Sequence, residues 1–154
     1  MSLKPLYSKP GHLIRRLQQI AVAIFMEETA EFGLTPVQYA ALIAVREHPD
    51  IDVTRLSSLI AFDRSTLGNV VKRLVAKRWL ERRGGQPDRR IKRLRVTAAG
   101  RQLLKAIDPA VQRAQTRMLA PIPKGEQKRL VEQLKLLVEI NNVHSRAPMR
   151  SLED

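Results

Sequence analysis

The chain has 154 residues, no cysteine, and 28 lysine and arginine residues against 15 aspartate and glutamate, giving a formal net charge of +13. The length fits one domain with an extension, and the lack of cysteine excludes disulfides, thiolate metal sites and thiol-based redox sensing. The positive charge favours a polyanionic partner, nucleic acid above all. No apolar run approaches the about 20 residues of a membrane span and no signal peptide is visible, so we expect a cytoplasmic protein that does not contact a membrane.

Aromatic residues make up only 4% of the chain. A protein that stacks unpaired bases needs several exposed rings, so this composition favours duplex DNA over single strands or RNA.

The first third of the chain predicts two helices. Apolar residues recur at helical spacing from Leu13 to Phe25. The motif LTPVQ follows, in which Thr35 is placed as N-cap and Gln38 stands three positions later. This arrangement is a capping box, and it predicts a second helix through about Arg46.

The next two helices are short and closely spaced. One is expected from near Asp52 to Ile60, and Asp63 is placed to cap the other, whose apolar positions from Leu67 to Val75 share one face. Two helices joined this tightly are typical of a helix-turn-helix. The opposite face of the second helix has the polar mixture of a recognition helix, which meets base edges near its N-terminus. Its residues are Arg64, Ser65, Thr66, Asn69, Lys72 and Arg73.

A basic hairpin and two long helices complete the chain. Residues 79–83 and 91–96 are expected as two strands across the turn GGQPD, together forming a wing. Thr97 is placed to cap a long fifth helix, and a sixth helix runs to about Asn141.

This order of elements resembles the MarR family of bacterial transcription regulators over roughly residues 10–142. The wing signature of the family matches Asp88, Arg90, Thr97 and Gly100 in spacing, and DRSTLGNVVKRL and LTPVQYAAL match its helices. The resemblance implies a mainly α fold with a small two- or three-stranded β-wing and long N- and C-terminal dimerisation helices. The expected parts are an N-terminal dimerisation helix (1–34), a winged helix-turn-helix (35–99), C-terminal dimerisation helices (100–143) and a mobile tail (144–154).

The resemblance also implies how the chain meets DNA. A homodimer would place two recognition helices in the major groove of a pseudo-palindromic operator, and each wing would place an arginine in the minor groove. Arg90 takes that role by position, with Arg89 as a second candidate, and Lys92 is among the flanking basic residues that would hold phosphates. Asp88 is expected to orient the wing by pairing with an arginine, either Arg73 or Arg90.

The first helix opens with PGHLIRRLQQ, which gathers His12, Arg15 and Arg16 within two turns. Such a group can bind a carboxylate, and Tyr39 could line the side of an aromatic ring. Within the family this start resembles regulators of aromatic-acid breakdown, including repressors of nicotinate catabolism. It predicts a small aromatic carboxylate effector, such as a hydroxynicotinate-type acid. The alternative is that these charges are solvated or form pairs across a dimer interface.

The favoured function is therefore a ligand-responsive repressor that leaves its operator when the effector binds. The alternative is a non-specific architectural DNA-binding protein, which the charge alone would permit. An enzyme is not expected, because no glycine-rich phosphate loop, metal-ligand cluster or nucleophile–base set stands out. Neither a cofactor nor a metal is predicted.

Overall fold

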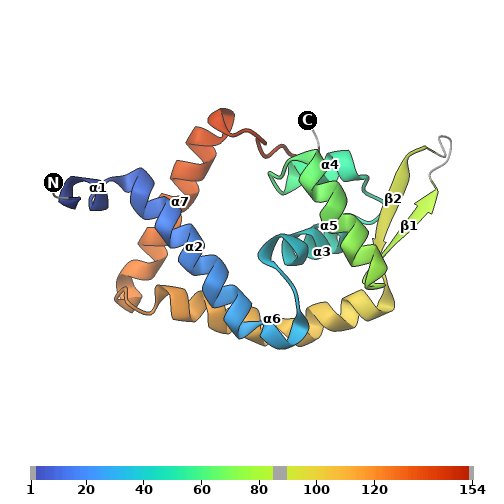
Figure 1. Cartoon of the computed structure of the whole chain (residues 1–154), viewed down its shortest axis with the longest axis horizontal. Coiled ribbons are helices and arrows are strands. Elements are labelled where there is room, and N and C mark those ends of the chain that lie inside the picture. The colour runs from blue at the N-terminus through green and yellow to red at the C-terminus, as the bar shows by residue number, and fades with distance from the viewer. Residues whose placement is uncertain (1–2, 85–89, 153–154) are drawn as a thin grey trace.

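The computed structural model describes residues 3–84 and 90–152. Figure 1 shows a long helix, α6, that joins a helical end near the N-terminus to a lobe that carries the wing. The helices are α1 (Lys4–Tyr7), α2 (Pro10–Glu28), α3 (Pro36–Glu47), α4 (Val53–Leu59), α5 (Arg64–Ala76), α6 (Ala98–Leu119) and α7 (Lys124–Asn141). Two 3-10 turns, η1 (Ala30–Phe32) and η2 (Asn142–His144), and two strands, β1 (Leu80–Gly84) and β2 (Lys92–Val96), complete the elements.

Side-chain caps begin four of these helices. Thr35 accepts a hydrogen bond from the Gln38 N–H, and the Gln38 side chain accepts one from the Thr35 N–H, so the predicted capping box is confirmed. At the starts of α4, α5 and α6, the side chains of Asp52, Asp63 and Thr97 each accept a hydrogen bond from the N–H three residues later. Each cap satisfies an N–H that the first helical turn leaves without an intrahelical partner.

The hydrophobic core lies in the lobe where α3, α4 and α5 meet the wing, and α2 and α6 also contribute side chains to it. Its side chains come from every one of these elements, and they are almost fully shielded from solvent. They include Leu42, Leu56, Leu67, Leu74 and Leu94. The core therefore holds α5 by its apolar face and leaves its polar face outward.

Strands β1 and β2 pair antiparallel, from Leu80 opposite Val96 to Gly84 opposite Lys92. On its other side β2 makes one isolated bridge, in which the Leu94 N–H donates to Ile51 O at 2.9 Å. The wing is thus a two-stranded ladder with one additional bridge, within the predicted range of two or three strands. This bridge fastens the wing to the loop that follows α3.

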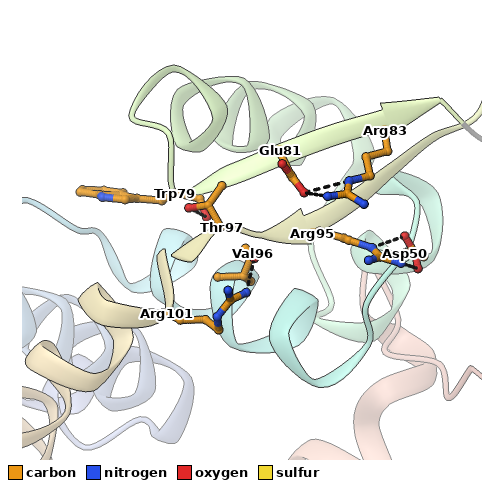
Figure 2. Close-up of polar contacts among 8 residues, drawn as sticks. All are labelled: Asp50, Trp79, Glu81, Arg83, Arg95, Val96, Thr97 and Arg101. Carbon is orange, nitrogen blue, oxygen red and sulfur yellow. Dashed lines mark hydrogen bonds and ion pairs between the residues drawn. The ribbon is translucent and has the colours of Figure 1, made fainter. Parts of the chain in front are cut away.

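The base of the wing lies against the start of α6. The Thr97 hydroxyl donates to Arg78 O at 2.6 Å and accepts from the Gly100 N–H at 3.0 Å, and Figure 2 shows Thr97 beside Trp79. A Cβ added to Gly100 would overlap the carbonyl oxygen of Trp79 and lie 2.7 Å from Val96 Cγ1. Only glycine fits at this contact between the wing and α6.

Helix α2 packs along α6 at the other end of the molecule. Arg113 of α6 pairs with Glu28 at 3.1 Å, and Arg117 pairs with Glu27 at 2.7 Å. Helix α2 begins at Pro10, before the apolar pattern that starts at Leu13. The one-turn helix α1 precedes it and has too few residues to show a helical period in the sequence.

Residues 145–152 cross from the end of α7 to α4, as Figure 1 shows. The Asn142 side chain bonds both the N–H and the carbonyl oxygen of Met149, at 2.9 and 2.8 Å. The Arg150 N–H donates to Ser58 O at 3.0 Å, and Leu152 packs against the core. The structure thus places this segment on the lobe that carries the wing, while its mobility stays a prediction.

Candidate DNA-binding surface and effector pocket

The helix-turn-helix consists of α4, a tight turn and α5. In the turn Ala61 adopts a left-handed φ of 53°, and the Phe62 N–H donates to Ser57 O at 3.0 Å. Asp63 then caps α5, which buries Leu67 and Leu74 and presents its other face to solvent. The six predicted recognition residues are all exposed: Arg64, Ser65, Thr66, Asn69, Lys72 and Arg73.

Hydrogen bonds lower the pKa of the Asp63 carboxyl to about 2. The largest cause is the Thr66 side chain, followed by the Thr66 N–H, which donates at 2.9 Å, and by the Ser65 hydroxyl, which donates at 2.7 Å. The carboxylate is therefore ionised over the whole physiological range and fixes the first turn of α5.

This shift predicts a pH dependence of stability that an Asp63→Asn variant isolates. Because the folded pKa of about 2 lies below the ordinary 3.8, the ionised carboxylate stabilises the fold above about pH 3.8, and this stabilisation is lost as the pH falls toward 2. Asparagine caps helices well but does not titrate. Urea unfolding from pH 6 to pH 2.5 should show wild type more stable than Asp63→Asn at the upper end, with the difference shrinking below pH 4. A difference that stays constant with pH would contradict this cause.

A cationic hollow of about 520 Å³ lies between the wing and the start of α4 and α5. Five of its lining residues are basic: Arg55, Arg64, Arg82, Arg90 and Lys92. Such a concave basic surface is suited to the phosphates of a DNA backbone. The sequence analysis named three of these residues and missed Arg55 and Arg82. Their signal was present, since Arg55 stands three residues after the Asp52 cap, on the first turn of α4, and Arg82 on the basic strand β1.

Asp88 and Arg89 lie outside the described residues. The pairing of Asp88 with Arg73 or Arg90, and the reach of Arg89 into the minor groove, stay predictions. Arg90 is exposed at the start of the second wing segment.

A different acidic residue orients the base of the wing. Asp50 forms two hydrogen bonds with the Arg95 guanidinium, at 2.7 and 2.5 Å, and Figure 2 shows this pair beside β2. The hydrogen bond from Arg95 lowers the pKa of the Asp50 carboxyl, with the charges of Arg95, Arg93 and Arg83 acting in the same direction. Asp50 adopts a left-handed φ of 68°. This bidentate pair fixes β2 to the loop after α3.

A second, apolar hollow of about 410 Å³ lies on α1 and α2. His12 and Arg16 line it together with Tyr7, and Leu13 and Leu17 are among its apolar walls. The Tyr7 and His12 rings are 5.7 Å apart. His12 Nε2 is buried and has no hydrogen-bond partner among the described residues. A buried polar atom without a hydrogen-bond partner costs free energy, and a ligand that forms a hydrogen bond with it removes that cost.

The structure brings together two of the four predicted effector residues. The Arg15 side chain instead donates to Gln19 at 3.2 Å. Tyr39 packs on Phe25, with ring centroids 5.9 Å apart, and its pKa is raised by burial and then by the charge of Asp108. Neither lines the hollow that His12 and Arg16 share. The sequence analysis missed Tyr7, because it stands before the first periodic helix.

Helices α2 and α7 expose large apolar side chains. On α2 these are Leu13, Ile14, Leu17 and Ile20, and on α7 they are Leu134, Leu136, Leu137, Val138 and Ile140. Val138 and Ile140 are 64% and 67% exposed, values typical of a surface that is covered by another molecule. In the described part of the chain, no helix is long and apolar enough to cross a membrane.

A helix-turn-helix with an exposed polar recognition face beside a cationic two-stranded wing defines a winged-helix DNA-binding protein. The sequence pattern of the MarR family matches residues 32–91. A probable transcriptional regulator from Pseudomonas aeruginosa superimposes with a TM-score of 0.81 at 31% identity, over 86% of this chain and 98% of that one. The chain belongs to the MarR family, and the predicted fold class is confirmed.

Two further relatives have more specific names. The HTH-type transcriptional repressor NicR of Pseudomonas putida is 27% identical over 129 residues, which make up 84% of this chain and 82% of NicR. BpsR of Bordetella bronchiseptica, whose DNA binding is regulated by 6-hydroxynicotinic acid, is 27% identical with a TM-score of 0.78, over 84% of this chain and 93% of BpsR. These relatives are transcriptional regulators rather than enzymes, and they support the resemblance to the nicotinate-type subgroup.

Proposed function

We propose that this chain is a homodimeric repressor that binds a pseudo-palindromic operator and is released by a small aromatic carboxylate. One observation carries the DNA-binding part: the exposed polar face of α5 adjoins the cationic hollow beside the wing, and Arg64 belongs to both. A surface of this kind combines groups that read base edges with groups that bind phosphates. The relative NicR is named a repressor, which supports repression as the proposed role of this chain.

Selection from a random-sequence DNA library tests the operator. We expect enrichment of two inverted half-sites whose centres are about 34–36 Å apart, or a multiple of that spacing, because a symmetric dimer presents two recognition helices to one face of the duplex. A non-specific architectural protein would enrich no sequence. If the selection enriches no sequence and palindromic duplexes bind no more tightly than bulk DNA, the architectural alternative would replace the proposal.

The exposed apolar faces of α2 and α7 support the dimer. A second copy that covers α7 would remove its apolar side chains from water, since α7 has no fully buried residue in one copy, and at α2 it would enclose the hollow on that helix rather than fill it. Light scattering should therefore give a mass of about twice the 17.5 kDa chain. Replacement of Leu137 by aspartate should shift this mass toward the monomer, whereas a monomeric wild type would overturn the proposed dimer.

The hollow on α1 and α2 supports an acid effector. Arg16 supplies a cation, His12 supplies an unpartnered nitrogen, and the walls are otherwise mostly apolar, which suits a flat ring with one carboxylate. The regulation of BpsR by 6-hydroxynicotinic acid makes that compound the first to try. The effector would act by preferring one spacing of the recognition helices, so bound operator must weaken effector binding by the same factor.

Two neighbouring arginines provide a matched test of this pocket. Arg16→Ala should raise the concentration of 6-hydroxynicotinic acid that releases half of the operator by about 10- to 100-fold, because a charge-assisted hydrogen bond contributes about 1.5–3 kcal/mol. Arg15→Ala removes the same charge one residue away, outside the hollow, and should change release little. Operator affinity without effector should be unchanged in both. Equal release in Arg16→Ala and wild type, measured by fluorescence anisotropy, would overturn this site.

A further inference from the structure

The C-terminal segment, residues 145–152, is attached to both α7 and α4 through its last four residues. At the α7 end, the Asn142 amide bonds both backbone groups of Met149. At the α4 end, the Arg150 N–H donates to Ser58 O, and Leu152 packs against the core. Ala147 and Pro148, which precede these attached residues, are partly buried. The segment therefore follows one path across the helix-turn-helix.

This path carries two arginines to the start of the recognition helix. Arg146 and Arg150 are exposed, and with Arg64 they line a hollow of about 290 Å³ above the turn that precedes α5. Asp63 also lines it, but its carboxylate accepts from Ser65 and Thr66 at the helix cap. Within residues 3–84 and 90–152, the side chains of Arg146 and Arg150 form no ion pair and no hydrogen bond.

Arg64 connects this hollow to the cationic hollow beside the wing, because it lines both. The basic residues thus form a band that runs from the wing, past the N-terminus of α5, to the C-terminal segment. A DNA backbone carries regularly spaced negative charges, so a continuous band of basic residues can contact several consecutive phosphates. The members of the band are Arg55, Arg64, Arg82, Arg90, Lys92, Arg146 and Arg150.

We propose that the C-terminal segment is part of the DNA-binding surface, and that Arg146 and Arg150 bind backbone phosphates on the side of α5 opposite the wing. The proposal rests on the proposed DNA-binding function and extends its contact surface beyond the helix-turn-helix and the wing. The two arginines contribute affinity without sequence preference, because phosphate contacts carry no base information. The opposite role, a segment that shields α5 from DNA, is an outcome of the same test.

The salt dependence of DNA binding measures these contacts. Binding of the full chain is followed on two 30-base-pair duplexes, the sequence that the wild type enriches and a mixed sequence, between 50 and 300 mM potassium chloride. Each phosphate contact contributes about 0.9 to the slope of log affinity against log salt. The Arg146→Ala/Arg150→Ala variant should lower this slope by about 2 per protomer on both duplexes, and Arg146→Lys/Arg150→Lys should retain it.

The matched control is Lys124→Ala/Lys128→Ala, which removes the same charge at the start of α7, far from the wing (Figure 1). It should leave the slope at the wild-type value, and circular dichroism should show all three variants folded. A slope for Arg146→Ala/Arg150→Ala equal to that of the control would overturn the proposal, as would tighter binding. If the wild type enriches no sequence, the operator function fails separately, and the mixed duplex still decides the role of the segment.

Discussion

Replacing Gly100 with alanine is expected to lower the free energy of unfolding by roughly 2–3 kcal/mol. The added Cβ would overlap the carbonyl oxygen of Trp79 and press on Val96 Cγ1. Overpacking of a well-packed contact costs about 1–3 kcal/mol, and this contact stands at the upper end because one neighbour is backbone, which cannot rotate away. Urea unfolding followed by circular dichroism gives the difference directly, provided that the slope with denaturant is unchanged.

Gly68→Ala is the matched control. Gly68 also lies within a helix, α5, but a Cβ there meets no atom within 4 Å. Alanine should therefore stabilise the fold by about 0.5–1 kcal/mol, because it reduces the conformational freedom of the unfolded chain. If both substitutions changed stability by the same amount and in the same direction, helix propensity rather than the contact at the wing base would be responsible.

Replacing Asn69 with alanine is expected to reduce the preference for the operator by about 1–3 kcal/mol per protomer. Asn69 is exposed on the second turn of α5, and its neutral amide both donates and accepts hydrogen bonds. An amide can pair with both hydrogen-bonding groups of an adenine edge in the major groove. Affinity for the enriched sequence should fall, while affinity for a mixed-sequence duplex should stay at the wild-type value.

Lys72→Ala separates base reading from charge. Lys72 is one turn further along the exposed face of α5, and its ammonium has three donors and no acceptor, which suits it to a phosphate. This variant should weaken binding to both duplexes by the same factor and reduce the salt slope by about 0.9 per lost contact. An Asn69→Ala variant that behaved in this same way would show that Asn69 does not read bases.

The helix starts could be predicted because their signals are local. Thr35, Asp52, Asp63 and Thr97 each cap a helix within three residues of their own position. The wing attachment could not be predicted in this way. Asp50 and Arg95 are 45 residues apart, and only the folded chain shows that they form the pair which fixes β2.

The candidate sites likewise contain some residues that local sequence patterns predict and others that only the folded chain brings together. The polar face of α5 follows from helical spacing alone, and the structure leaves all six of its predicted residues exposed. On α2, by contrast, Arg15 and Arg16 differ by about 100° around the helix axis. Only the position of α1 shows that Arg16 faces the hollow. Arg146 and Arg150 stand in a stretch without any periodic pattern, so their position beside Arg64 depends wholly on the path of the chain.

The fit of Gly100 under Trp79 also has a mechanical consequence. Since no space separates them, a rotation of the wing about the first turn of α6 would have to displace the Trp79 backbone, so the contact favours movement of the wing and α6 as one body. Helix α6 has 22 residues, hence a length of about 33 Å, and its other end bears on α2 through Arg113 and Arg117. A tilt of about 5° at these ion pairs would move the start of α6, about 22–28 Å away, by about 2 Å. The wing lies beyond that point and would move further, which is the scale of a phosphate contact.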